Sequence, residues 1–226
     1  VTEFVGTSIG DTIGLLIANV DPMLKEAMHL DKFRSIGIIG GRTGAGPQIM
    51  AVDDAVKATN TEVVSVELPR DTKGGAGHGS LIIVGADDVS DARRAVEIAL
   101  QSLPKYFGDV YGNDAGHLEF QYSARASYCL EKALGARLGK AFGMTCAGPA
   151  AIGVVLADTA VKAANVEVVA YSSPHNGGTS YSNEVILCFV GDSGAVRQAV
   201  RAAIDVGKTR LGALGDEPKS TTTPYI

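Results

Sequence analysis

Short apolar runs alternate with amphipathic stretches along the first half of the chain. Apolar runs of four to eight residues predict buried strands, and apolar positions three or four apart predict helices with one buried face. The predicted order is a strand over 14–20, a helix from Pro22 to about Leu30, strands over 35–40, 62–68 and 81–84, and helices over 47–60 and 89–103, the last ending near Pro104. We expect the strands on either side of the glycine-rich segment 72–79 to pair as an antiparallel hairpin, which makes the fold class α+β.

The second half of the chain repeats the first. Residues 53–64 return as residues 158–169 with nine of twelve positions identical, where about one match is expected by chance. Further landmarks follow in the same order in both halves, for example Ala45-Gly46-Pro47 and Ala147-Gly148-Pro149. A repeat of this length indicates a duplicated domain. The predicted domains are 1–110 and 111–218, followed by a tail over 219–226.

The composition limits the classes of function. Charged residues make up only 20% of the 226 residues, less than an isolated protein's surface normally carries, which indicates a surface covered by neighbouring molecules. A net charge of −5, spread along the chain, argues against nucleic-acid binding. The absence of an apolar run of 18 residues excludes a membrane-spanning helix from the prediction. The three cysteines, all in the second half, are expected to be reduced, buried thiols of a cytoplasmic protein.

No catalytic or metal-binding motif is evident. The four histidines lack the paired spacing of metal ligands and have no cysteine near them in the sequence: His29, His78, His117 and His175. Asp53 and Asp158 recur in both halves beside recurring lysines, and we expect them to be exposed charges on helices. No set of residues supplies an acid, a base and an oxyanion hole together. The sequence therefore predicts neither an enzyme nor a cofactor or metal site, although Cys146 and Cys188 could approach one another in the fold.

Two segments of the second half, 160–171 and 190–200, resemble the signature of bacterial microcompartment shell proteins, and the first half shows it more weakly at 55–66 and 84–96. The elements that precede each signature resemble the circularly permuted form of that domain. The resemblance implies two tandem permuted domains, and a homotrimer with a pseudohexameric outline that tiles with neighbouring shell proteins. In the family's edge motif, the residues that match are Lys57, Asn60, Lys162 and Asn165.

The same resemblance implies selective passage of small polar metabolites such as glycerol or 1,2-propanediol through the shell. The loops 72–79 and 173–182 carry glycine and polar side chains that could line a pore, and a surface loop without such a role is the alternative. The candidate pore residues are Gly75, His78, His175, Asn176, Thr179 and Ser180. Encapsulated enzymes are further candidate partners. The alternative function is a regulatory protein that binds a small molecule and is built from duplicated α+β domains.

Overall fold

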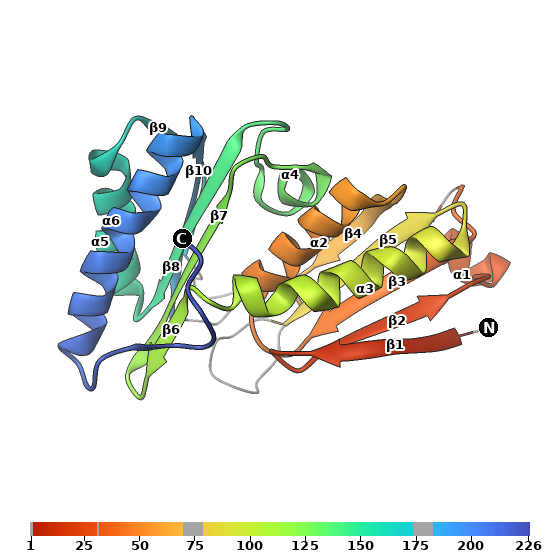
Figure 1. The fold of residues 1–226 in the computed structure, drawn as a ribbon, viewed down its shortest axis with the longest axis horizontal. Coiled ribbons are helices and arrows are strands. Elements are labelled where there is room, and N and C mark those ends of the chain that lie inside the picture. Colours follow the sequence, from red (N-terminus) through yellow and green to blue (C-terminus); the bar gives the residue numbers. More distant parts are fainter. Residues whose placement is uncertain (1, 31, 70–78, 174–182) are drawn as a thin grey trace.

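The structure, a computed structural model, describes residues 2–30, 32–69, 79–173 and 183–226. These residues form two antiparallel sheets that stand side by side, each covered by a pair of long helices (Figure 1). The predicted α+β class with two tandem domains is therefore confirmed. No helix among the described residues is both long and apolar enough to cross a membrane.

The first half builds a five-stranded sheet in the order β1-β2-β3-β5-β4, with neighbouring strands antiparallel. The hairpin predicted around the glycine-rich segment is confirmed, because β4 and β5 pair with Glu62 opposite Gly85. The elements are β1 (Thr2–Ser8), β2 (Thr12–Ile17), α1 (Pro22–Ala27), β3 (Ser35–Gly41), α2 (Gly46–Ala58), β4 (Glu62–Glu67), β5 (Ser80–Ala86) and α3 (Val89–Tyr106).

The second half repeats this topology in the order β6-β7-β8-β10-β9, and a short strand from the tail, β11, is added beside β6. In each half the first two strands, β1 and β2 or β6 and β7, form a hairpin at one side of the sheet. This hairpin precedes the helix and strands of the repeated signature, as the permuted form requires. The elements are β6 (Val110–Asn113), β7 (Gly116–Ser123), α4 (Tyr128–Leu134), β8 (Ala141–Gly148), α5 (Ala150–Ala163), β9 (Val166–Ser172), β10 (Val185–Gly191), α6 (Ser193–Gly212) and β11 (Lys219–Ser220).

Helix α3 does not end near Pro104, as the sequence predicted, but continues to Tyr106. A proline inside a helix has no N–H and leaves the carbonyl four residues earlier without its usual donor. Here that carbonyl belongs to Leu100, and it accepts a hydrogen bond of 2.9 Å from the Ser8 hydroxyl at the end of β1. The sequence prediction did not include β1, and therefore missed the contact that supports the last turn of the helix.

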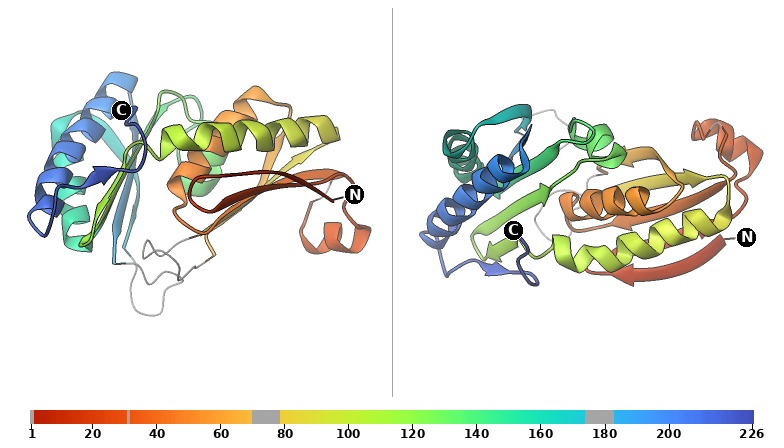
Figure 2. Two further views of the ribbon diagram at one scale, coloured as in Figure 1. Left: turned by 60° about the horizontal axis from the view of Figure 1, so that its bottom comes forward. Right: turned by 45° about the horizontal axis from the view of Figure 1, so that its top comes forward.

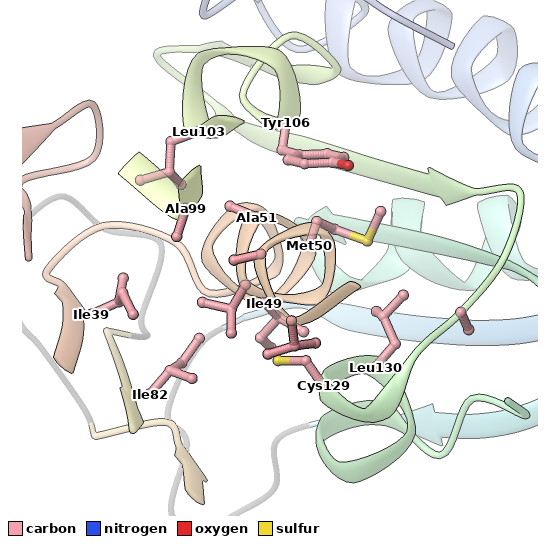
Figure 3. Packing of buried hydrophobic residues seen from close by; sticks show 14 of the residues in the cluster. Ile39, Ile49, Met50, Ala51, Ile82, Ala99, Leu103, Tyr106, Cys129 and Leu130 are labelled. Atoms are coloured by element: carbon pink, nitrogen blue, oxygen red, sulfur yellow. The ribbon is translucent and has the colours of Figure 1, made fainter. Parts of the chain in front are cut away.

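The two halves share one core. Helix α2 packs against its own sheet and α3, and it also contacts α4 and β7 of the second half, where side chains of β8 and β10 join the same apolar core. Figure 3 shows Ile49 and Met50 of α2 between Ile39 and Ile82 of the first sheet and Cys129 and Leu130 of α4. The second sheet is thus covered on both faces, by α5 and α6 on one and by α2 and α4 on the other (right view of Figure 2). We call the contact between α2 and the second half the seam.

Asp53 lies fully buried in this seam, so the prediction that it is an exposed helix charge is wrong. Its carboxylate accepts hydrogen bonds from the backbone N–H groups of Ser127 and Leu130, at the start of α4, and lies 2.7 Å from the ammonium of Lys57. Burial raises the pKa of Asp53, while the Lys57 ammonium and the two N–H donors act in the opposite direction. One helix of the first half therefore caps a helix of the second.

The tail closes the junction of the two halves from another side. The backbone N–H groups of Tyr225 and Ile226 both donate to the Asp109 carboxylate, at 2.8 and 3.1 Å. The Tyr225 ring packs edge-on against Tyr106 of α3, with ring centroids 5.4 Å apart, and its hydroxyl contacts Tyr122 of β7. The tail predicted at 219–226 therefore ties α3 to the second sheet.

We expect Asp53→Ala to destabilise the protein by about 2–4 kcal/mol. Loss of an N-cap costs about 0.5–2 kcal/mol and a buried N–H donor left unsatisfied costs about 1–3 kcal/mol; both figures describe the same lost hydrogen bonds and are not added. Urea unfolding at a fixed protein concentration measures the change. Asp53→Asn is the matched variant: Ser127 and Leu130 both donate to Oδ1, an acceptor that asparagine retains, so its loss should be less than half as large. Equal losses for the two variants would show that the charge of Asp53, and not the cap, stabilises the seam.

Candidate functional site

The two edge lysines predicted from the repeat lie in different surroundings. In the second half, the side chain of Lys162 is 73% exposed, and its ammonium lies 2.7 Å from the Asp158 carboxylate, which is also exposed. In the first half, the Lys57 ammonium contacts Asp53, lies 3.5 Å from Asp54, and donates to the Ser123 hydroxyl of β7 at 3.4 Å. Lys57 is therefore engaged at the seam, whereas its counterpart projects from the surface.

The two asparagines of the same motif are both exposed. Asn60 lies between α2 and β4, and Asn165 lies at the corresponding place between α5 and β9. The candidate pore residues Gly75, His78, His175, Asn176, Thr179 and Ser180 lie outside the described residues. What the structure describes is the base of each predicted loop. Leu68, before the first loop, and Glu184, after the second, line one cavity.

This cavity lies in the seam and has a volume of about 100 Å³. The first half contributes the start of α2, with its N-cap residue Ala45 and its first residues Gly46 and Pro47, together with Phe107. The second half contributes polar side chains from its sheet, namely His117, Glu119, Cys146 and Glu184. The cavity therefore has an apolar wall from one half and a wall with ionisable groups from the other.

Three of these side chains converge at one point. His117 Nε2 lies 3.3 Å from Glu184 Oε2, and Cys146 Sγ lies 3.8 Å from the same oxygen and 4.0 Å from His117 Nε2. Cys146 and Glu184 are buried, and His117 is 24% exposed. Among the described residues, this is the group whose ligand atoms all lie within 4.8 Å of one another, as the binding of one metal ion requires.

Strand pairing brings the three residues together. In β7, His117 stands opposite Gly148 of β8, two residues from Cys146. In β10, Val185 stands opposite Ala147, which places Glu184 beside the end of β8. Gly148 leaves room for the imidazole, because a Cβ atom there would lie 2.8 Å from His117 Cε1. Strand β7, the adjacent strand β8 and the residue just before β10 therefore present an imidazole, a thiol and a carboxylate to the same cavity.

The protonation of the cysteines argues against a nucleophilic role. Burial, followed by the charge of Glu184, holds the pKa of Cys146 well above its usual value, and burial raises the pKa of Cys188 to about 12. A thiol that stays protonated at neutral pH is a poor nucleophile. The arrangement suits binding better than covalent catalysis.

Sequence reasoning missed this cluster. It tested the histidines for ligand spacing along the chain, and His117 and Cys146 are 29 residues apart. The signal that could have found them is the register of the β7–β8 pair, which depends on a connection containing α4 that the sequence does not fix. The approach that the sequence did raise, between Cys146 and Cys188, is not part of the cluster.

Comparisons with known proteins agree on one family. Residues 35–113 and 141–216 match the family model of the BMC domain. The chain is 68% identical over 226 residues to the bacterial microcompartment shell protein PduB of Salmonella typhimurium (strain LT2), covering all of this chain and 83% of that protein.

Two solved structures are similar over almost the whole chain. One is a trimeric bacterial microcompartment shell protein PduB, with a TM-score of 0.95, 52% identity and coverage of 99% of both chains. The other is EtuB from Clostridium kluyveri, with a TM-score of 0.95, 56% identity and coverage of 99% of this chain and 98% of that one.

Proposed function

Since the chain belongs to the BMC-domain family of bacterial microcompartment shell proteins, we propose that it assembles as a homotrimer, tiles into the shell and admits small polar metabolites. The observation that carries the homotrimer is a surface buried in one half and exposed in the other.

The domain boundary that we propose, between residues 110 and 111, falls at the start of β6.

Helix α5 exposes the positions that its counterpart α2 buries in the seam. Ile49 and Met50 of α2 are each 1% exposed, whereas Val154 and Val155, 105 residues later on α5, are 50% and 40% exposed. Asp53 is fully buried and Asp158 has an exposed side chain. Two adjacent apolar side chains exposed on one face of a helix indicate an interface with another molecule.

The complementary surface lies at the opposite end of the molecule. Helix α1 is the first-half counterpart of α4, which packs on α2, but α1 stands apart from both pairs of long helices (Figures 1 and 2). Its apolar side chains Met23 and Leu24 are 80% and 45% exposed. If α5 of one copy contacts α1 of the next as α2 contacts α4 within the chain, the contact is head-to-tail.

A head-to-tail contact forms a ring when its rotation closes. Each chain supplies two similar modules joined by the seam, so a contact that repeats the seam adds modules at the same angle. Three copies then give six modules around one axis, which supports the pseudohexameric outline. The trimeric state of the solved PduB structure supports the same number.

We expect Val154→Glu with Val155→Glu to convert the trimer into monomers that retain their fold. Both side chains are exposed in the single chain, so the changes should affect the contact between copies and leave folding intact. Size-exclusion chromatography with light scattering measures the mass, and circular dichroism checks the fold. Leu214→Glu, at an exposed site beyond α6, is the control and should remain trimeric. A trimer that survives the double substitution would rule out this face.

For tiling, we propose that Lys162 and Asn165 contact neighbouring tiles, with Asn60 and the exposed part of Lys57 at the corresponding edge of the first half. The family motif supports this assignment, and the side chain of Lys57, which contacts Asp53 in the seam, is still 30% exposed, so a lysine at this position can reach both the seam and the edge. We expect Lys162→Asp to abolish ordered sheets in electron micrographs and to leave trimers intact, because the proposed trimer contact depends on the apolar side chains of Val154 and Val155. Lys219→Asp, the same charge reversal on β11, should still form sheets. Sheets formed equally by both variants would contradict the edge assignment, and a discrete oligomer that never tiles would favour the regulatory alternative.

For passage, we propose that loops 72–79 and 173–182 carry a small polyol such as glycerol or 1,2-propanediol past the seam. Their candidate residues are Gly75, His78, His175, Asn176, Thr179 and Ser180, whose polar groups can exchange weak hydrogen bonds with hydroxyls. The cavity at the base of both loops supports the location. We propose no catalysis, because the relatives are shell proteins and the buried thiols are protonated.

Crystals soaked in glycerol should show the polyol at these loops. Asn176→Leu with Thr179→Val should lose it, because both changes remove hydrogen-bonding groups at similar volume. Glycerol that is retained in the variant, or that binds only at distant sites, would contradict the passage proposal and leave the trimer and the edge untouched.

A further inference from the structure

We propose that His117, Cys146 and Glu184 bind one divalent ion of the zinc class per chain, at the wall of the seam cavity. This site goes beyond the shell function, and it opposes the expectation from the sequence that the chain binds no metal. The inference rests on the geometry of three ligand atoms and on the chemistry of the donors.

The distances between the ligand atoms are those of one face of a tetrahedron, slightly expanded. Tetrahedral zinc with bonds of about 2.3 Å to sulfur and about 2.0–2.1 Å to nitrogen and oxygen separates its ligands by about 3.3–3.6 Å. The observed separations are 3.3 Å for nitrogen to oxygen, 3.8 Å for sulfur to oxygen and 4.0 Å for sulfur to nitrogen. Contraction by a few tenths of an ångström brings all three ligands onto one ion.

The donor set selects the kind of metal. Thiolate and imidazole favour zinc, cobalt or cadmium, whereas magnesium and calcium take oxygen ligands. Binding requires the Cys146 thiol to release its proton, and the dication then compensates both the thiolate and the Glu184 carboxylate. Glu119, opposite Cys146 in the β7–β8 pair, lines the same cavity and adds to its negative character.

The sheet fixes the ligands before the metal arrives. His117 and Cys146 belong to adjacent paired strands, and Glu184 directly precedes a third. A fourth position faces the cavity, where water or a small ligand could complete the coordination. Three protein ligands with one open position describe a site that binds an exchangeable group.

The site belongs to the second half alone. Strand pairing places the first-half counterparts of the three ligands at Asp11, Gly40 and Gly79, where neither a thiol nor an imidazole is available. The part of the chain that the structure describes therefore carries one such site, and the expected stoichiometry is one ion per chain whatever the oligomeric state.

Cobalt(II) titration of the full, untagged chain tests the proposal. We expect one equivalent per chain and a thiolate-to-cobalt charge-transfer band in the near ultraviolet, with zinc displacing the cobalt. Cys146→Ala should abolish the band, and Glu184→Gln should weaken binding by at least tenfold. Cys129→Ala is the matched control, because Cys129 is equally buried and belongs to the same core, yet lies outside the cluster. It should keep both the band and the stoichiometry.

Three results would overturn the site. They are the absence of the band in the unmodified chain, a band that persists in Cys146→Ala, and a band lost equally in Cys129→Ala. If Cys146→Ala fails to fold, as judged by circular dichroism, His117→Gln replaces it. The imidazole is partly exposed, so this variant should fold and still lose at least tenfold in affinity. None of these readouts depends on trimer formation, so they are independent of the proposed shell function.

Discussion

Helix α2 has to be buried on two sides at once, and the arrangement of the molecule depends on this requirement. One side carries apolar residues that pack on the helix's own sheet and on α3, and the other carries Ile49, Met50 and Asp53. A single module covers only one of these sides, because its own sheet and α3 both pack on that side. The second module supplies a sheet face and the start of α4 in the required place. The duplicated chain therefore forms one seam and leaves apolar side chains exposed on α5 and α1.

The hydrogen bonds of Asp53 fix the position of one half of the chain against the other. Apolar contacts tolerate small shifts of one half against the other, but the carboxylate must meet two backbone N–H groups and an ammonium together. Buried polar groups of this kind are costly when they are not matched. The same requirement positions the start of α2 against the second sheet, and so defines the cavity in which His117, Cys146 and Glu184 converge.

Much of the fold could be predicted from the sequence, because its signals are local. The hairpin around residues 72–79, the α2 helix and the duplication follow from apolar spacing and from repeated residues. The errors came from contacts between distant segments. Asp53 was judged exposed because Lys57 is its neighbour along the helix, whereas its other partners are 74 and 77 residues away. Pro104 was judged to end α3 because the donor from Ser8 could not be foreseen. The cluster of ligand atoms was missed for the same reason, because the register of β7 against β8 cannot be predicted from the sequence of either strand alone.

The same aspartate occupies two environments in one chain, buried at position 53 and exposed at position 158. Substitutions at equivalent positions of the two halves should therefore fail at different stages in the life of the protein. A change on α2 acts while a single chain folds, and its products are open to chaperones and proteases. A change at the exposed positions Val154 and Val155 of α5 would, under the proposed trimer contact, act only when folded chains associate. Under the proposed trimer contact, the same surface therefore serves folding in the first half and assembly in the second.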